Sequence, residues 1–247
     1  MRITLKLKPS TSEISLPLHY QSTVQGMLYH SMRSQYLSDF IHNKGYQKEK
    51  RTFKLFTFSR LLGKHELQID KKQIVFYDEV TCHIGTAITE MGKELIDRFT
   101  NQTELELGNN RCLIQGIEVE NKKVEREEVI IEMLSPITVY STYSSLDGKR
   151  KTHYFQPLDP MFSQLVERNF VNKYEAAYHQ KPLSRLIIEP LEVTRKDKVV
   201  TKFKDFYVTA WLGRYRLKSS PEYLTFLYNT GLGGRNSQGF GMFRIID

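Results

Sequence analysis

The stretch that decides the fold lies near the C-terminus and reads Gly231-Leu232-Gly233-Gly234-Arg235-Asn236-Ser237-Gln238-Gly239-Phe240-Gly241. It contains two Gly-apolar-Gly units separated by five residues. Glycine adopts positive φ freely and leaves peptide N–H groups uncovered, so a loop of this kind can wrap those groups around a phosphate. Arg235 would add a charge-assisted donor to the same anion.

The segments on either side of this loop exclude two better-known glycine motifs. Residues 221–229 are predicted to form a helix and residues 240–246 a strand. A dinucleotide-binding fingerprint needs a strand before its glycines and a helix after them, and a Walker loop needs Gly-Lys-Ser/Thr. The plain alternative is a glycine-rich turn that only ends a helix. The pairing of two Gly-apolar-Gly units argues against that alternative.

The loop, its position in the chain and the opening of the sequence resemble the CRISPR-associated endoribonucleases that process repeat RNA. These enzymes belong to the RAMP superfamily (repeat-associated mysterious proteins), whose hallmark is a C-terminal glycine-rich loop. The superfamily includes members that cleave RNA and members that only bind it. The resemblance covers essentially the whole chain and implies two tandem ferredoxin-like domains.

The composition favours a polyanionic partner. The chain has 36 Lys and Arg against 28 Asp and Glu, a formal net charge of +8, and such a balance is typical of nucleic-acid-binding proteins. Cys82 and Cys112 lack the spacing of metal ligands, so we expect two buried thiols. No apolar run is long enough to span a membrane and no signal peptide is recognisable, which predicts a cytoplasmic protein without a membrane partner.

Apolar periodicity in the first half predicts the order β-α-β-β-α-β. A helix begins near Ser22 and a second, shorter helical piece contains His42. A second helical stripe follows, formed by Ile84, Ile88, Met91, Leu95 and Phe99. The predicted strands of this half cover residues 2–8, 53–59, 74–80 and 111–119.

The same order begins again after a charged linker at residues 118–128. Asp159-Pro160 is a good N-cap and first-turn pair for a long helix. The predicted strands of this half cover residues 128–134, 137–140, 186–193, 203–212 and 240–246. We therefore predict an α+β fold of two tandem ferredoxin-like (RRM-like) domains with antiparallel sheets, residues 1–122 and 123–247.

The chemistry expected from these residues is metal-independent RNA cleavage without a cofactor. No Asp/Glu cluster has the spacing of a two-metal site. RNA can cleave itself when its 2′-hydroxyl is deprotonated and aligned on the adjacent phosphate, which leaves a 2′,3′-cyclic phosphate and a 5′-hydroxyl. An enzyme must supply a proton-transfer group, a donor to the phosphorane charge and a hold on the geometry. Of the seven histidines, His42 opens the most basic part of the first half.

The resemblance implies a catalytic set of a Tyr in the first helix, a His after it and a Lys beyond, which fall on Tyr29, His42 and Lys54. His30 is the reserve candidate. Thirteen residues at about 100° each would place Tyr29 and His42 on nearly opposite faces of one continuous helix. They can share a site only if the helix breaks between them, and the change of pattern between Ser34 and Ser38 permits such a break.

RNA contacts are expected at the glycine loop and at two basic segments, although either basic segment could simply be a solvated face. Binding through phosphates should weaken as salt rises. The predicted RNA-binding residues are Gly231, Gly233, Gly234, Arg235, Asn236, Ser237, Gln238, Gly239, Gly241, Lys149, Arg150, Lys151, Arg195, Lys196 and Lys198.

The function predicted from the sequence is cleavage of CRISPR precursor RNA within its repeats, which produces guide RNAs. The main alternative is a non-catalytic RAMP-type RNA-binding subunit of a CRISPR effector complex. An unrelated tandem RNA-recognition protein is disfavoured by the glycine loop and by the lack of an RNP-type aromatic motif. The expected partners are repeat RNA, single-stranded or hairpin, and other effector subunits, with the protein itself a monomer or homodimer.

Overall fold

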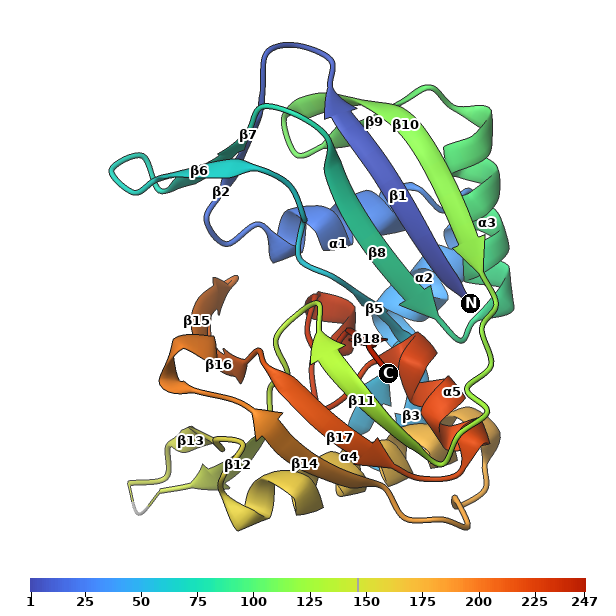
Figure 1. Ribbon diagram of the computed structural model, residues 1–247, viewed down its shortest axis with the longest axis vertical. Coiled ribbons are helices and arrows are strands. Elements are labelled where there is room, and N and C mark those ends of the chain that lie inside the picture. The colour runs from blue at the N-terminus through green and yellow to red at the C-terminus, as the bar shows by residue number, and fades with distance from the viewer. Residues whose placement is uncertain (146) are drawn as a thin grey trace.

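The computed structural model describes residues 1–145 and 147–247 and shows an α+β protein with antiparallel sheets. Its two principal sheets come from the first and the second half of the chain and lie one above the other in Figure 1. Residues 121–127 contain no helix or strand and connect the two sheets. No helix in the described ranges is both long enough and apolar enough to cross a bilayer.

The first sheet is built around β1, in which Ile3, Leu5 and Leu7 are fully buried. This alternation is the period of a strand with one face on the core. β1 pairs antiparallel with β8 and β10, so that Leu5 lies opposite Cys82 on one side and Ile117 on the other. In spatial order, the strands are β5 (Phe56–Phe58), β8 (Val80–Thr86), β1 (Arg2–Pro9), β10 (Asn110–Glu120) and β9 (Glu104–Leu107).

Helices cover the core face of this sheet, and α3 buries Met91, Leu95 and Phe99 at helical spacing. The helical segments are α1 (Gln21–His30), α2 (Gln35–Asp39), the π-helical turn η1 (Phe40–Lys44) and α3 (Thr89–Asn101). The other strands of this half form a three-stranded sheet and a hairpin. They are β2 (Ile14–Pro17), β7 (Gln73–Phe76) and β6 (His65–Gln68), and β3 (Tyr46–Lys48) with β4 (Arg51–Phe53).

The second sheet repeats this plan. Its central strand β11 buries Val129, Ile131 and Met133, while the side chains between them lie on the opposite face. In spatial order, the strands are β14 (Ile187–Glu192), β17 (Arg214–Lys218), β11 (Glu128–Met133) and β18 (Phe243–Ile245). The helices are α4 (Pro160–Tyr178) and α5 (Pro221–Thr230), with 3₁₀ turns η2 (Arg195–Asp197) and η3 (Asn236–Gln238). Two hairpins complete this half, β12 (Tyr140–Ser144) with β13 (Arg150–Tyr154) and β15 (Lys198–Phe203) with β16 (Phe206–Trp211).

Several expectations from the sequence are confirmed. The α+β class and the antiparallel sheets are as predicted. Asp159 caps α4 by accepting a hydrogen bond from the Met161 N–H at 2.8 Å. Cys82 and Cys112 are free and buried, and burial raises their thiol pKa values to about 12 and about 11.

The third strand of the first sheet is not where the sequence pattern places it. The predicted strand 74–80 is largely β7, which belongs to the small sheet, and the main sheet uses β8 instead. Ile84, predicted to lie on a helix, is a β8 residue opposite Ile3. The four-residue spacing between Ile84 and Ile88 fits the period of a helix. In the structure, however, Ile84 is buried on the same face as Cys82 two residues earlier, which is the period of a strand.

The second half differs from the prediction in the same way. The predicted strand 203–212 is largely β16, which pairs with β15 in a hairpin, and the third strand of the main sheet is β17. Only Tyr215 and Leu217 of β17 face the core. Three of the five residues of β17 are cations, a composition that is also typical of a surface loop. Only its pairing with β11 and β14 identifies it as a strand.

The glycine loop of the second half docks against the first half. Thr57 in β5 donates its hydroxyl to the Phe240 carbonyl at 3.1 Å, and Gln25 in α1 donates its amide to the Ser237 carbonyl at 2.6 Å. A Cβ on Gly239 would lie 2.6 Å from the ring of Phe58. The two halves therefore meet at the loop with no room for a side chain.

Gly239→Ala should destabilise the protein more than Gly148→Ala. Both glycines have positive φ, but a Cβ at Gly148 meets nothing within 4 Å. The backbone conformation should cost about 1 kcal/mol in both variants, and the overpacking against Phe58 should cost about 1–3 kcal/mol more in Gly239→Ala. The measurement is the midpoint of thermal unfolding for the two variants and the parent. Equal midpoints for the two variants would contradict the tight docking of the loop.

Candidate functional site

A break between α1 and α2 brings Tyr29 and His42 together. α1 ends at His30, and Ser34 caps α2 by accepting a hydrogen bond from the Leu37 N–H at 3.2 Å. The rings of Tyr29 and His42 then meet edge to face, with centroids 5.1 Å apart. The helix break that a site shared by Tyr29 and His42 requires is therefore present.

The π-helical turn η1 presents His42 to solvent. Ile41 is fully buried and anchors the turn, whereas the neighbouring His42 is exposed. Gly45, with φ of 59°, ends the turn and donates its N–H to the Phe40 carbonyl at 2.7 Å. Single π-helical turns often lie at functional sites because they redirect one side chain.

The orientation of His42 leaves one ring nitrogen free. Its Nδ1 lies 2.7 Å from Oδ1 of Asn43. With that amide oxygen as acceptor, Nδ1 carries the proton, and Nε2 keeps the lone pair that can take a proton from a substrate.

Lys54 completes the group. Its Nζ donates to the backbone carbonyl of His42 and lies 5.8 Å from the centre of the Tyr29 ring. The predicted strand 53–59 is interrupted at this point, because Leu55 has φ of 50° and only Phe56–Phe58 pair with β8. Burial, with a contribution from nearby Lys204, lowers the pKa of Lys54.

Tyr29 is a neutral group within this cluster. Its hydroxyl is buried without a hydrogen-bond partner among the described residues, and burial raises its pKa well above the ordinary range. The structure thus brings Tyr29, His42 and Lys54 together. His30 instead lines a separate cavity of about 280 Å³ with Arg98 and Glu104.

The glycine loop has the predicted neighbours, α5 before it and β18 after it. Gly231, Gly233, Gly239 and Gly241 all have positive φ, which explains why glycine stands at these positions. The guanidinium of Arg235 lies 5.1 Å from the centre of the Tyr140 ring and donates to the Gln238 side chain at 3.0 Å.

A cavity of about 710 Å³ adjoins the loop and reaches Lys54. Its walls are the glycine loop, residues 50–56, the β12–β13 hairpin and α4. No Asp or Glu lines it among the described residues. Its cationic residues are Lys50, Arg51, Lys54, Arg150, Arg168, Lys173 and Arg235.

Four of these cations were not among the predicted site residues: Lys50, Arg51, Arg168 and Lys173. The first two lie shortly before Lys54, in the basic stretch that His42 opens. Arg168 and Lys173 lie in α4, where nothing in the sequence distinguishes them from ordinary helix residues.

The predicted basic segments separate into two groups. Arg150 lines the cavity at the start of β13, and Lys149 and Lys151 flank it. Arg195, Lys196 and Lys198 lie elsewhere, because Thr194 and Asp197 of their turn line a different cavity, of about 580 Å³.

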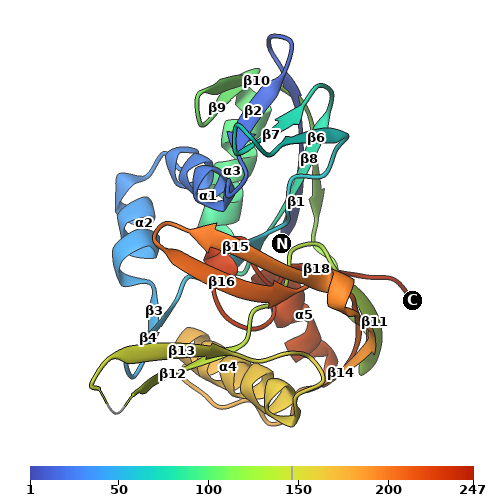
Figure 2. The ribbon, with the colours of Figure 1, turned by 90° about the vertical axis from the view of Figure 1, so that its left-hand side faces the viewer.

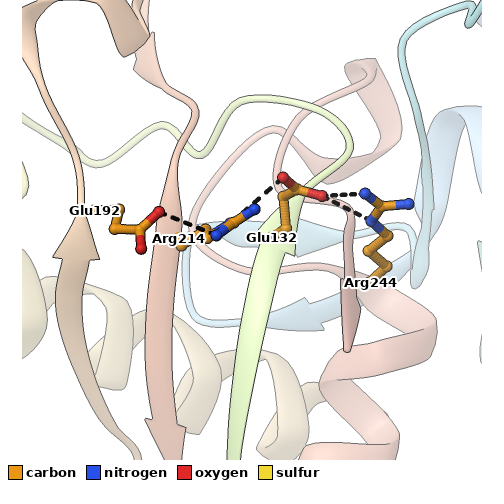
Figure 3. A network of polar contacts seen from close by, with 4 residues as sticks. All are labelled: Glu132, Glu192, Arg214 and Arg244. Atoms are coloured by element: carbon orange, nitrogen blue, oxygen red, sulfur yellow. Dashed lines mark hydrogen bonds and ion pairs between the residues drawn. The ribbon is translucent and has the colours of Figure 1, made fainter. Parts of the chain in front are cut away.

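The open face of the second sheet carries arginines whose charge is already neutralised (Figure 3). Arg214 lies between Glu192 at 3.0 Å and Glu132 at 3.6 Å, and Arg244 also pairs with Glu132. Arg216 on the same strand pairs with carboxylates of both neighbouring strands.

The cavity differs from this open face in its charge. Within the described ranges, none of the seven cavity cations forms a salt bridge. Unpaired cations attract a polyanion more strongly than paired ones, so the cavity is the stronger candidate for nucleic-acid binding. In the described part of the chain, no three His, Cys, Asp or Glu side chains converge as metal ligands would.

Comparisons with known proteins agree with the resemblance seen in the sequence. A family model described as CRISPR-associated protein Cas6, N-terminal, matches residues 15–118, and one described as CRISPR associated protein Cas6, C-terminal, matches residues 119–245. The CRISPR-associated endoribonuclease Cas6 of Pyrococcus furiosus is 26% identical over 250 aligned positions that cover 99% of this chain and 90% of that protein.

Solved structures establish the same fold. One, described as a Cas6-related gene from Pyrococcus furiosus, has a TM-score of 0.85 at 23% identity and covers 100% of this chain and 98% of that chain. Another, described as a RAMP protein binding different RNA substrates, has a TM-score of 0.83 at 22% identity and covers 100% of both chains.

Lys204→Gln should raise the pKa of Lys54, because it removes a like charge that disfavours the ammonium form. The measurement is the pH titration of ¹³C-methylated lysines by NMR, with the Lys54 signal assigned from its absence in Lys54→Arg. Lys198→Gln, at the other end of β15, is the control and should leave the signal unchanged. A Lys54 signal that titrates identically in parent and Lys204→Gln would show that the hairpin tip does not act on Lys54.

Proposed function

Because this chain belongs to the CRISPR-associated Cas6 family, we propose that it is an endoribonuclease that cuts CRISPR precursor RNA within its repeats and so produces guide RNAs. The observation that carries this proposal is the contact of His42 and Tyr29 with Lys54, which lines a cavity of unpaired cations. A binding surface and a proton-transfer group are thus adjacent.

The proposed reaction uses the RNA's own 2′-hydroxyl. Nε2 of His42 moves the proton on or off the scissile linkage, the 2′-oxygen attacks the adjacent phosphorus, and the bond to the 5′-oxygen breaks. The 5′-oxygen takes up a proton, so the products are a 2′,3′-cyclic phosphate and a 5′-hydroxyl. A positioned acid or base contributes about 10²–10⁴ to such a rate.

Lys54 and Tyr29 have supporting roles in this proposal. The Lys54 ammonium, which lines the cavity, stabilises the charge that develops on the phosphorane. Tyr29 packs edge to face with the His42 ring, and as a buried neutral phenol it orients the imidazole.

The cavity would hold the RNA backbone on one side of the cut. Arg168 and Arg150 face it from α4 and β13, and Arg235 faces it from the glycine loop. Cations from several elements can contact successive phosphates, which fixes the register of the strand.

The rival function is RNA binding without cleavage, as a subunit of a CRISPR effector complex. One of the similar structures is described only by its RNA binding. The charged cavity suits both functions. The two functions differ in whether His42 transfers a proton to or from the bound RNA.

The purified protein should cleave repeat RNA in excess EDTA, and His42→Ala should slow that cleavage by about 10²–10⁴-fold. A single 2′-deoxy nucleotide at the cut should abolish cleavage and leave binding intact. The measurement is the rate of appearance of fragments with 2′,3′-cyclic phosphate ends. Tight binding by a parent protein that never cleaves would favour RNA binding without cleavage. Undiminished cleavage by His42→Ala would contradict the role of His42 and make His30 the next candidate for the proton-transfer group.

Arg168→Gln should weaken binding to the non-cleavable RNA and lower the slope of log Kd against log salt by about 1, as expected for one lost phosphate contact. Arg216→Gln on the open face is the matched control, since that arginine is already paired with Glu128 and Glu189. Binding is measured by fluorescence anisotropy over a range of salt concentrations. A larger effect of Arg216→Gln than of Arg168→Gln would place the RNA on the open sheet instead.

A further inference from the structure

Lys173 is a charged residue on the buried face of α4. The other buried residues of the helix are Phe, Leu, Val, Tyr and Ala, whereas Lys173 is 1% exposed. A buried ammonium is costly unless its three donors are satisfied. Its place in the fold therefore calls for an explanation other than packing.

The acceptors of Lys173 belong to the glycine loop and its entrance. Its Nζ donates to the Gly231 carbonyl at 2.5 Å, to Oδ1 of Asn236 at 3.0 Å and, more weakly, to the Thr230 carbonyl at 3.5 Å. Three donors thus have three acceptors. No carboxylate is among them in the described part of the chain, and burial lowers the pKa of Lys173 to about 7.

Asn236 connects Lys173 to the rest of the glycine loop. Its Nδ2 donates to the carbonyls of Leu232 at 2.9 Å and Phe240 at 3.1 Å. One side chain therefore joins the first and the last part of the loop, while its oxygen is held by Lys173.

Two of the signature glycines make room for this amide. A Cβ on Gly231 would lie 2.8 Å from Nδ2 of Asn236, and one on Gly241 would lie 2.7 Å from it and collide with the Leu232 carbonyl. The paired Gly-apolar-Gly pattern is thus explained in part by the space that Asn236 occupies between its two units.

We propose that Lys173 is a positioning residue that, through Asn236, fixes the glycine loop in the shape that receives an RNA phosphate. Lys173 also lines the cationic cavity, so an RNA phosphate bound there would favour its charged form. The inference rests on the proposed RNA-binding function. Lys173 acts from behind the loop, and the contact with RNA is made by the loop itself.

The test compares Lys173→Met with Val166→Ala, which changes a buried residue of the same helix that is not among those lining the cavity. In Lys173→Met, the Kd for non-cleavable repeat RNA should rise at least tenfold, while Val166→Ala stays within about twofold of the parent. In single-turnover cleavage, the half-saturating protein concentration should rise in Lys173→Met with the saturated rate nearly unchanged. Because loss of folded protein would also raise the apparent Kd and the half-saturating concentration, both are expressed per folded protein, whose fraction is measured by circular dichroism.

A second readout needs no RNA. Hydrogen exchange of the amides of residues 232–241 should accelerate in Lys173→Met but not in Val166→Ala. Asn236→Ala, which removes the connection from the loop side, should have the same effect, and the double variant should add little to either single one. If Lys173→Met does not fold, the loop exchange of Asn236→Ala alone tests the inference.

The outcomes are separable. Unchanged loop exchange in both Lys173→Met and Asn236→Ala, or equal losses of affinity in Lys173→Met and Val166→Ala, would overturn the inference. A parent protein that binds repeat RNA but never cleaves it would overturn the proposed nuclease and leave this inference standing. A parent that does not bind repeat RNA at all would overturn both the proposed function and the role of Lys173 in binding.

Discussion

The contact on which the rest of the structure depends is the docking of the C-terminal glycine loop against α1 and β5 of the first half. Gly239 lies against the ring of Phe58 where no Cβ fits, and Gln25 and Thr57 hold the loop carbonyls. Tyr29 lies in the same helix as Gln25, and Lys54 lies in the two-residue connection between β4 and β5. The loop proposed to hold phosphate is therefore placed beside the residues proposed to cleave.

In addition, each half has a hairpin that contacts the other half. The β3–β4 hairpin of the first half reaches α4, where Lys48 pairs with Glu175 at 2.6 Å. The β15–β16 hairpin of the second half reaches the segment before α1, where Thr201 bonds to His19 at 2.9 Å. In Figure 2 the β15–β16 hairpin lies between the upper and lower halves, and the β3–β4 hairpin lies to its left, beside the β12–β13 hairpin. The cavity has walls from both halves, so neither half alone contains it.

The sequence predicts those features that depend on local chemistry. The glycine loop, the Asp159 cap and the alternation in β1 follow from backbone preferences and burial period. The third strand of each sheet could not be found this way, because the exposed cations of β17 conceal its two buried residues and Ile84 fits two periods at once. The cluster of Tyr29, His42 and Lys54 was anticipated through family resemblance, whereas Arg168 and Lys173 acquire meaning only once α4 packs beside the loop.

In the proposed complex, the scissile phosphate of the RNA lies between the glycine loop and the His42 cluster. The most direct measurement is a crystal structure of the protein with repeat RNA that carries a 2′-deoxy nucleotide at the cut. We expect the scissile phosphate within about 3 Å of both Lys54 Nζ and a donor of the glycine loop, with Nε2 of His42 facing the 2′ position or the 5′-oxygen. A scissile phosphate on the open face of either sheet, remote from His42, would contradict it.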